Sequence, residues 1–189
     1  VAVAPALIGQ YLCCRDGNGA VSRWRIDETE AYAGPHDLAC HAAKGRTPRT
    51  EVMFGPPGNW YIYLCYGIHW MANIVTGEPG FPAAVLLRGV EGHDGPGKLT
   101  KAIGIDRRYN MRPATPASGL WFAYSGGTIP VETLTTSPRV GIGYAGEPWT
   151  SMPWRWLNRP ATTAKAKARR TKAGPGKELG QRKPRVPRR

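Results

Sequence analysis

Three acidic side chains crowd residues 26–32, IDETEAY, and two of them could do proton chemistry together. If this segment is a strand, Glu28 and Glu30 point to one face with Tyr32, because side chains alternate across a strand. Two carboxylates on one face favour protonation of one of them, or a cationic neighbour. The segment predicts either a solvated strand face or a general base at a strand end that faces a pocket.

Two histidines follow in HDLACHAA, residues 36–43. The five-residue spacing of His36 and His41 suits two metal ligands on one helix face poorly, and no nearby carboxylate pair completes a metal site. A histidine that hydrogen-bonds in a pocket, or one held structurally, fits better than a zinc ligand. The Gly-rich HDGPGKL, residues 93–99, lacks the GxxxxGK[ST] spacing of a phosphate-binding loop, so it is weak evidence for a phosphate site.

An aromatic-rich run, YIYLCYGIHWMANIV at residues 61–75, reads as two strands that break at Gly67. Tyr61 and Tyr63 share one strand face, where they either line a site or pack in the core. A type II turn needs positive φ at its third residue, which Gly67 supplies, and this places Tyr66 at an exposed tip. An exposed aromatic ring can stack on bases or enter a base stack as a wedge.

The elements that must position these side chains are mostly strands. We expect strands over residues 21–32, on both sides of Gly67 and over AAVLLRGVE, and a short helix that runs into a strand in PALIGQYLCC. A further helix follows the Gly-rich loop, with Leu99, Ile103 and Ala102 on one face. This pattern predicts an α+β fold with a mainly antiparallel sheet.

The net charge of +13 is concentrated at one end of the chain. Residues 159–189 hold 12 Lys and Arg and one acid, whereas residues 1–158 hold 14 Lys and Arg and 12 acids. We expect one domain over 1–158 and a basic, disordered tail over 159–189, because the tail has little to bury. Such a tail favours a polyanionic partner, most often nucleic acid, although a solubilising extension is the alternative.

Four cysteines without a CxxC pair indicate free thiols in a reducing compartment. No run approaches the roughly 18 apolar residues of a membrane span. The first residues lack the charged start of a signal peptide.

Five blocks occur in an order that resembles the alkyladenine (3-methyladenine) DNA glycosylase family, of the methylpurine-DNA glycosylase type. They are RIDETEAYAGPHDLACHA, YIYLCYGIHWMANIV, AAVLLRGVE, GPGKLTKAIGI and RVGIGYAGE, and the likeness spans residues 5–158. The resemblance implies a single compact α+β domain with a curved, mainly antiparallel sheet and short helices. It also implies a protruding β-hairpin that inserts into DNA.

The same resemblance implies roles for individual residues. Glu30 matches the general base that activates water, and Arg88 the arginine that holds Glu30 and the water. Tyr66 matches the tyrosine that intercalates into the DNA. The base-binding residues would be Tyr32, His41, Tyr63 and Asn73, and the residues that contact the DNA backbone and groove would be Arg46, Arg49 and Met53.

The activity implied is that of a monofunctional DNA glycosylase in base excision repair. It flips out alkylated or deaminated purines (3-methyladenine, hypoxanthine and, as a further candidate, ethenoadenine) and hydrolyses the N-glycosidic bond without a cofactor or metal. The implied partner is double-stranded DNA with damaged purines, bound by a monomer away from membranes, in the cytoplasm at a bacterial nucleoid or in a eukaryotic nucleus. A non-catalytic nucleic-acid-binding module and a small-nucleotide hydrolase are the alternatives.

Overall fold

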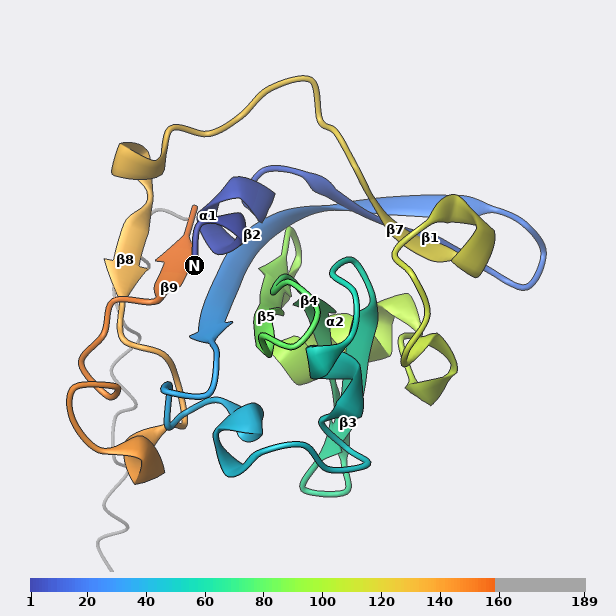
Figure 1. Cartoon of the computed structure of the whole chain (residues 1–189). Helices are drawn as coiled ribbons and strands as arrows, with labels where there is room; N and C mark the ends of the chain where they lie inside the picture. The colour runs from blue at the N-terminus through green and yellow to red at the C-terminus, as the bar shows by residue number, and fades with distance from the viewer. Residues whose placement is uncertain (159–189) are drawn as a thin grey trace, which may run out of the picture.

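A long strand, β2 (Val21–Ala33), organises the computed structural model, which describes residues 1–158 (Figure 1). Its first part pairs with β1, and its second part pairs with β5 and with the short β9. The main path of the sheet runs β3-β4-β5-β2-β1-β7, and every strand pair is antiparallel. The predicted α+β fold with a mainly antiparallel sheet is therefore confirmed. The other strands are β1 (Tyr11–Arg15), β3 (Trp60–Cys65), β4 (His69–Val75), β5 (Ala83–Val90), β6 (His93–Asp94), β7 (Leu120–Ala123), β8 (Thr135–Ser137) and β9 (Arg155–Leu157).

Two α-helices within residues 1–158 pack on this sheet. The helix α1 (Val3–Leu7) contacts β2, and α2 (Pro96–Ile103) contacts β4 and β5. Leu99 and Ile103 are buried as expected, but Ala102 is exposed, and Thr100 takes the third inward position and donates to the carbonyl of Trp70. The remaining helical segments are 3-10 turns at His41–Lys44, Glu51–Phe54, Arg107–Tyr109, Pro116–Ser118, Val131–Thr133 and Gly143–Ala145.

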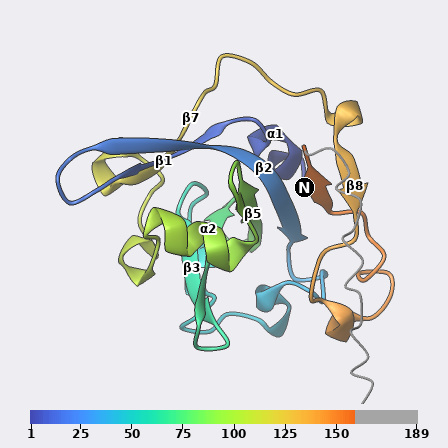
Figure 2. The same ribbon diagram turned by 180° about the vertical axis from the view of Figure 1, so that it is seen from behind.

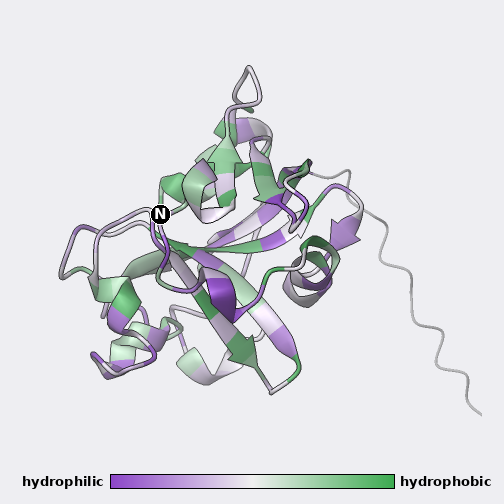
Figure 3. Cartoon of the chain, turned by 90° about the vertical axis from the view of Figure 1, so that its right-hand side faces the viewer, coloured by the Kyte–Doolittle hydropathy of each residue, from purple (hydrophilic) through white to green (hydrophobic). Residues whose placement is uncertain are grey.

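The two faces of the β3–β4–β5 region bury different groups of side chains. Trp60 and Ile62 join the main core with both helices, whereas Tyr61 joins a second cluster with Met53. Tyr63 packs against the edge of that second cluster. Figure 3 shows hydrophobic residues along both the strands and the helices. The alternation of Tyr61, Ile62 and Tyr63 across β3 therefore supplies one face to the core and one to the covering segment 41–54.

A segment late in the described chain returns to the middle of the sheet. The strand β9 pairs with β2 on one side and with β8 on the other, and Figure 2 shows this pair beside α1 and the end of β2. Neither of these three-residue strands was predicted from the sequence. Their position brings Arg155 opposite Glu30.

Cys13, Cys14 and Cys40 are buried free thiols, and Cys65 is half-buried. No helix in the described part of the chain is long and apolar enough to cross a bilayer. The tail expected over 159–189 lies outside the described residues.

Candidate active site

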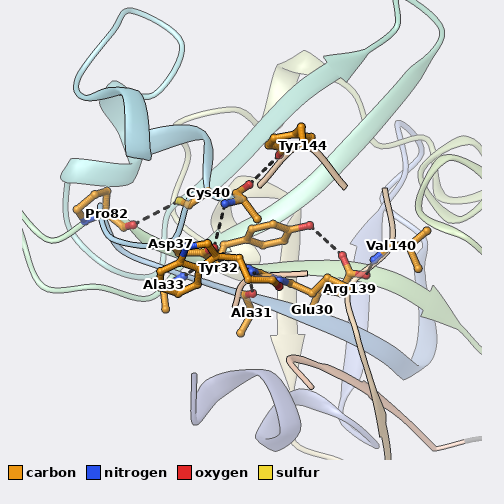
Figure 4. Close-up of polar contacts among 12 residues, drawn as sticks. Glu30, Ala31, Tyr32, Ala33, Asp37, Cys40, Pro82, Arg139, Val140 and Tyr144 are labelled. Atoms are coloured by element: carbon orange, nitrogen blue, oxygen red, sulfur yellow. Dashed lines mark hydrogen bonds and ion pairs between the residues drawn. The ribbon is translucent and has the colours of Figure 1, made fainter. Parts of the chain in front are cut away.

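Glu30 lies fully buried near the end of β2, with 0% of its surface exposed. Its Oε2 accepts a hydrogen bond from the Tyr32 hydroxyl at 2.9 Å, and its Oε1 accepts one from the Val140 N–H at 2.8 Å (Figure 4). The Nε of Arg88 is 3.4 Å from Oε1. A solvated strand face, one of the two alternatives for this segment, is therefore wrong.

Arg88 contacts Glu28 more closely than it contacts Glu30. Its Nε donates to Oε1 of Glu28 at 2.8 Å, and the Nε of Arg155 donates to the same oxygen at 2.6 Å. The paired carboxylates therefore have two cationic neighbours, Arg88 and Arg155. Arg155 was not predicted from the sequence, because nothing near it in the chain signals a partner 127 residues away.

The two carboxylates differ in proton affinity because their surroundings differ. Burial raises the pKa of Glu30 above its usual value, although Arg88, the Val140 N–H and the Tyr32 hydroxyl act against the rise. Burial also raises the pKa of Glu28, but the hydrogen bonds from Arg88 and Arg155 outweigh it and hold the pKa low. Glu28 is thus held as a fixed anion, whereas Glu30 is the better proton acceptor.

A cavity of about 220 Å³ opens beside these carboxylates. It is smaller than the roughly 300–1,000 Å³ of sites for drug-sized ligands, so it suits a small ligand. Three contacts of Glu30, namely Tyr32, Arg88 and Val140, line it. It also brings together the other predicted pocket residues: His41, Tyr63 and Asn73.

Aromatic rings form much of the pocket wall. The rings of His41 and Tyr63 lie 4.7 Å apart at 69°, and His41 Nδ1 is 2.9 Å from the Tyr61 hydroxyl. Asn73 Nδ2 donates to the Tyr61 carbonyl at 3.1 Å, which fixes the amide. Burial, aided by Arg49 and Lys44, lowers the pKa of His41 to about 4, so its imidazole is neutral at neutral pH.

The tip of the β3–β4 hairpin carries Tyr66, which is 91% exposed. Both Tyr66 and Gly67 have positive φ, at 51° and 68°, and the Ile68 N–H donates to the Cys65 carbonyl. Positive φ at both central positions is the pattern of a type I′ turn, so the predicted type II turn is wrong. Because Tyr in the left-handed region costs about 1–2 kcal/mol, this conformation is maintained against a local preference.

The segment 138–146 closes one side of the pocket. Arg139 forms a bidentate ion pair with Asp37 (Figure 4). Its guanidinium lies over the rings of Tyr32 and Trp154, at 4.8 and 5.0 Å from their centroids. The next residue, Val140, supplies the N–H that binds Glu30. No role was predicted from the sequence for any residue of this segment.

A second aromatic side chain of this segment lies at the pocket mouth. Tyr144 lines the pocket with Tyr66 and is 69% exposed, and its hydroxyl donates to the Ala39 carbonyl at 2.9 Å. The hydrogen bond fixes the ring at the rim although most of the side chain is exposed to solvent.

Of the three residues predicted to contact DNA, Arg46 and Arg49 are exposed and Met53 is buried. The guanidinium of Arg49 stacks 4.7 Å from the Tyr63 ring, and exposed Arg46 pairs with Glu51. Met53 is 2% exposed and lines the pocket. Its apolar side chain packs into the second cluster, so Met53 does not present the surface contact assigned to it. Within residues 1–158, no group of three His, Cys, Asp or Glu side chains could hold a metal ion.

Comparison with known proteins gives concordant matches over most of the chain. A family model described as methylpurine-DNA glycosylase matches residues 1–94 and 91–162. A protein of Myxococcus xanthus is 48% identical over 166 residues, covering 82% of this chain and 83% of the relative. Relatives from Anaeromyxobacter dehalogenans (44% identity, 84% of this chain and 82% of the relative) and Psychrobacter cryohalolentis (41%, 86% and 90%) are similar. All three carry the name "Putative 3-methyladenine DNA glycosylase".

Proposed function

The chain belongs to the methylpurine-DNA glycosylase family, and from this premise we propose that it flips damaged purines out of double-stranded DNA and excises them with water activated by Glu30. Enzymes of this kind hydrolyse N-glycosyl bonds. The proposed substrates are 3-methyladenine and hypoxanthine, with ethenoadenine as a further candidate. In this proposal, the protein is a monomer that acts on DNA in the cytoplasm, in base excision repair.

The observation that carries the proposal is a buried carboxylate behind the wall of a small aromatic pocket. A carboxylate has about four acceptor sites, and the Tyr32 hydroxyl and the Val140 N–H take two, so Glu30 can accept a further hydrogen bond from water. Its raised pKa suits a general base, because proton transfer is most efficient when the pKa of the base lies near the working pH.

The reaction that follows from this arrangement is a hydrolytic displacement at the sugar. The oxygen of water bonds to C1′ of the flipped nucleotide while the bond from C1′ to the purine nitrogen breaks. The electron pair of that bond leaves with the base, and Glu30 takes the proton lost by water. Arg88 stabilises the carboxylate and orients the water from the pocket side.

The pocket residues supply recognition in this proposal. A base inside a duplex is out of reach, so it must leave the stack at a cost of a few kcal/mol. Tyr66 fills the gap, and the rings of Tyr32, His41 and Tyr63 hold the flipped base. Neutral His41 offers one hydrogen bond to the six-position of the purine, and Asn73 excludes guanine by its exocyclic amine.

The test is excision from duplexes that carry hypoxanthine or an alkylated purine. Replacement Glu30→Gln should abolish base release under single-turnover conditions while binding to the lesion duplex stays within a few-fold. The matched control is Glu91→Gln, on the surface, which should leave release unchanged. Undiminished release by Glu30→Gln would refute the proposed mechanism. No observation favours a non-catalytic binding module for a chain of this family.

A further inference from the structure

The register of β2 against β5 places Arg88 in an unusual position. Glu28 pairs with Gly89, but the next pair joins Thr29 with Leu87, so the register passes over Arg88 on β5. Irregularities of this kind re-aim a side chain and are frequent next to active sites. Here the shift directs Arg88 toward both carboxylates of β2, with Nε 2.8 Å from Glu28 and 3.4 Å from Glu30.

Arg88 is shared between the two carboxylates, and this sharing affects how readily Glu30 accepts a proton. An arginine bound directly to a carboxylate favours its ionised form and lowers its tendency to take a proton. The shorter contact, 2.8 Å to Glu28, leaves Arg88 in a longer ion pair with Glu30, at 3.4 Å. Because Glu28 is nearly fully buried, its charge needs compensation of its own, and Arg155 from β9 supplies it.

We propose that Glu28 and Arg155 are positioning residues, which hold Arg88 on Glu28 so that Arg88 orients the attacking water without neutralising Glu30. This inference rests on the proposed role of Glu30 as the base. It assigns a function to a second buried carboxylate, Glu28, and to the short strand β9, which carries Arg155. Neither residue touches the substrate in this scheme, and both act through Arg88.

The pKa of Glu30 depends on the charged and titratable groups that face it. Glu28 and Tyr32 face it from β2, Arg88 from β5, Arg155 from β9, and the Val140 N–H from the closing segment. The Arg139–Asp37 pair lies behind Tyr32. The two positioning residues carry opposite charges, so their removal should move the proton affinity of Glu30 in opposite directions.

The direction of the change in the pKa of Glu30 follows from the contacts in each variant. In Glu28→Gln, Arg88 loses its charged anchor and is free to pair with Glu30, so the pKa of Glu30 falls. In Arg155→Gln, a cation that lowers the pKa of Glu30 is lost while Arg88 stays on Glu28, so the pKa of Glu30 rises. Since only the carboxylate form accepts a proton, the acidic limb of the pH–rate profile shows each change directly.

The experiment measures single-turnover release of hypoxanthine from a duplex as a function of pH. In Glu28→Gln the acidic limb should move to lower pH by about one unit and the plateau rate should fall about tenfold. In Arg155→Gln the acidic limb should move to higher pH by a similar amount. The double variant should show a limb between those of the single variants.

Controls separate these effects from loss of the fold. Thermal denaturation and affinity for the lesion duplex are measured for each variant, and Glu91→Gln and Arg108→Gln serve as surface controls that should keep the wild-type limb. If Glu28→Gln does not fold, Arg155→Gln, with its partly exposed side chain, still tests the sign. Limbs that stay in place, or that move the same way in both variants, would overturn the inference. Full release by Glu30→Gln would instead defeat the proposed function itself.

Discussion

Asp37 and Arg139 are separated by 102 residues and form a bidentate ion pair whose side chains have no exposed surface. The carboxylate of Asp37 also accepts the N–H groups of Ala33 and Ala39, and Arg139 donates to the Ala31 carbonyl. The pair therefore joins the end of β2 to the segment that closes the pocket. That segment carries the N–H that binds Glu30.

Breaking this pair should destabilise the protein strongly. Arg139→Met leaves a buried carboxylate without its cation, so the free energy of unfolding should fall by about 3–5 kcal/mol. Arg108→Met is the matched control, because Arg108 pairs with Asp106 at the surface, where the loss should stay below about 1 kcal/mol. Urea denaturation measures both. Equal losses in the two variants would contradict the importance of the buried pair.

Replacing Tyr66 should separate stability from activity. Asn tolerates the left-handed conformation that Tyr66 adopts, so Tyr66→Asn should keep or slightly raise the melting temperature. It should nevertheless slow release of hypoxanthine from a duplex, because the proposed wedge is lost. Tyr124→Asn changes another exposed tyrosine and should leave release unchanged. A large drop in melting temperature in Tyr66→Asn would instead indicate a core role for Tyr66.

His41 should contribute a measurable pH dependence to folding. Its folded pKa of about 4 lies below the usual value of 6.5, so the unfolded chain takes up the proton first as pH falls. The wild type should therefore lose stability as pH falls from 6.5 toward 4, and His41→Gln should lack this contribution. Chemical denaturation across this range measures the difference. Parallel curves for wild type and His41→Gln would refute it, and His36→Gln controls for the substitution.

The basic tail should affect affinity more than chemistry. Deletion of 159–189 removes 12 Lys and Arg and one acid, so DNA binding should depend less steeply on salt. Single-turnover release at low salt should stay near the wild-type rate, because we assign the site to residues 1–158. Binding isotherms over a salt series measure the slope. An unchanged slope would favour the solubilising role instead.

The sequence predicted the local part of the fold well. Alternation in residues 61–75 indicated the β3–β4 hairpin, its two faces and the exposed tip at Tyr66, because side-chain period and turn chemistry are local properties. The turn type was wrong because the prediction assumed that only Gly67 would adopt positive φ. Tyr66 also adopts it, at a cost that propensity alone would not predict.

Residue patterns alone left alternatives open for Glu30, His41 and Tyr63, and the resemblance named the pocket members; the pocket does bring Tyr32, His41, Tyr63 and Asn73 together. The residues that hold the site in place come from far along the chain. Val140 binds Glu30 across 110 residues and Arg155 binds Glu28 across 127. Such contacts depend on strand register and on how the chain returns to the sheet, and neither leaves a periodic signal in the sequence.

The preformed turn at the hairpin tip has a consequence for how lesions are found. Tyr66 is already exposed at the tip in the protein without DNA, so its ring is accessible to a duplex. Under the proposed role, the ring would probe each base step that the protein passes. The dwell time at a step would then depend on how easily the stack opens there. Discrimination would begin as a difference in residence time, before any purine reaches the pocket.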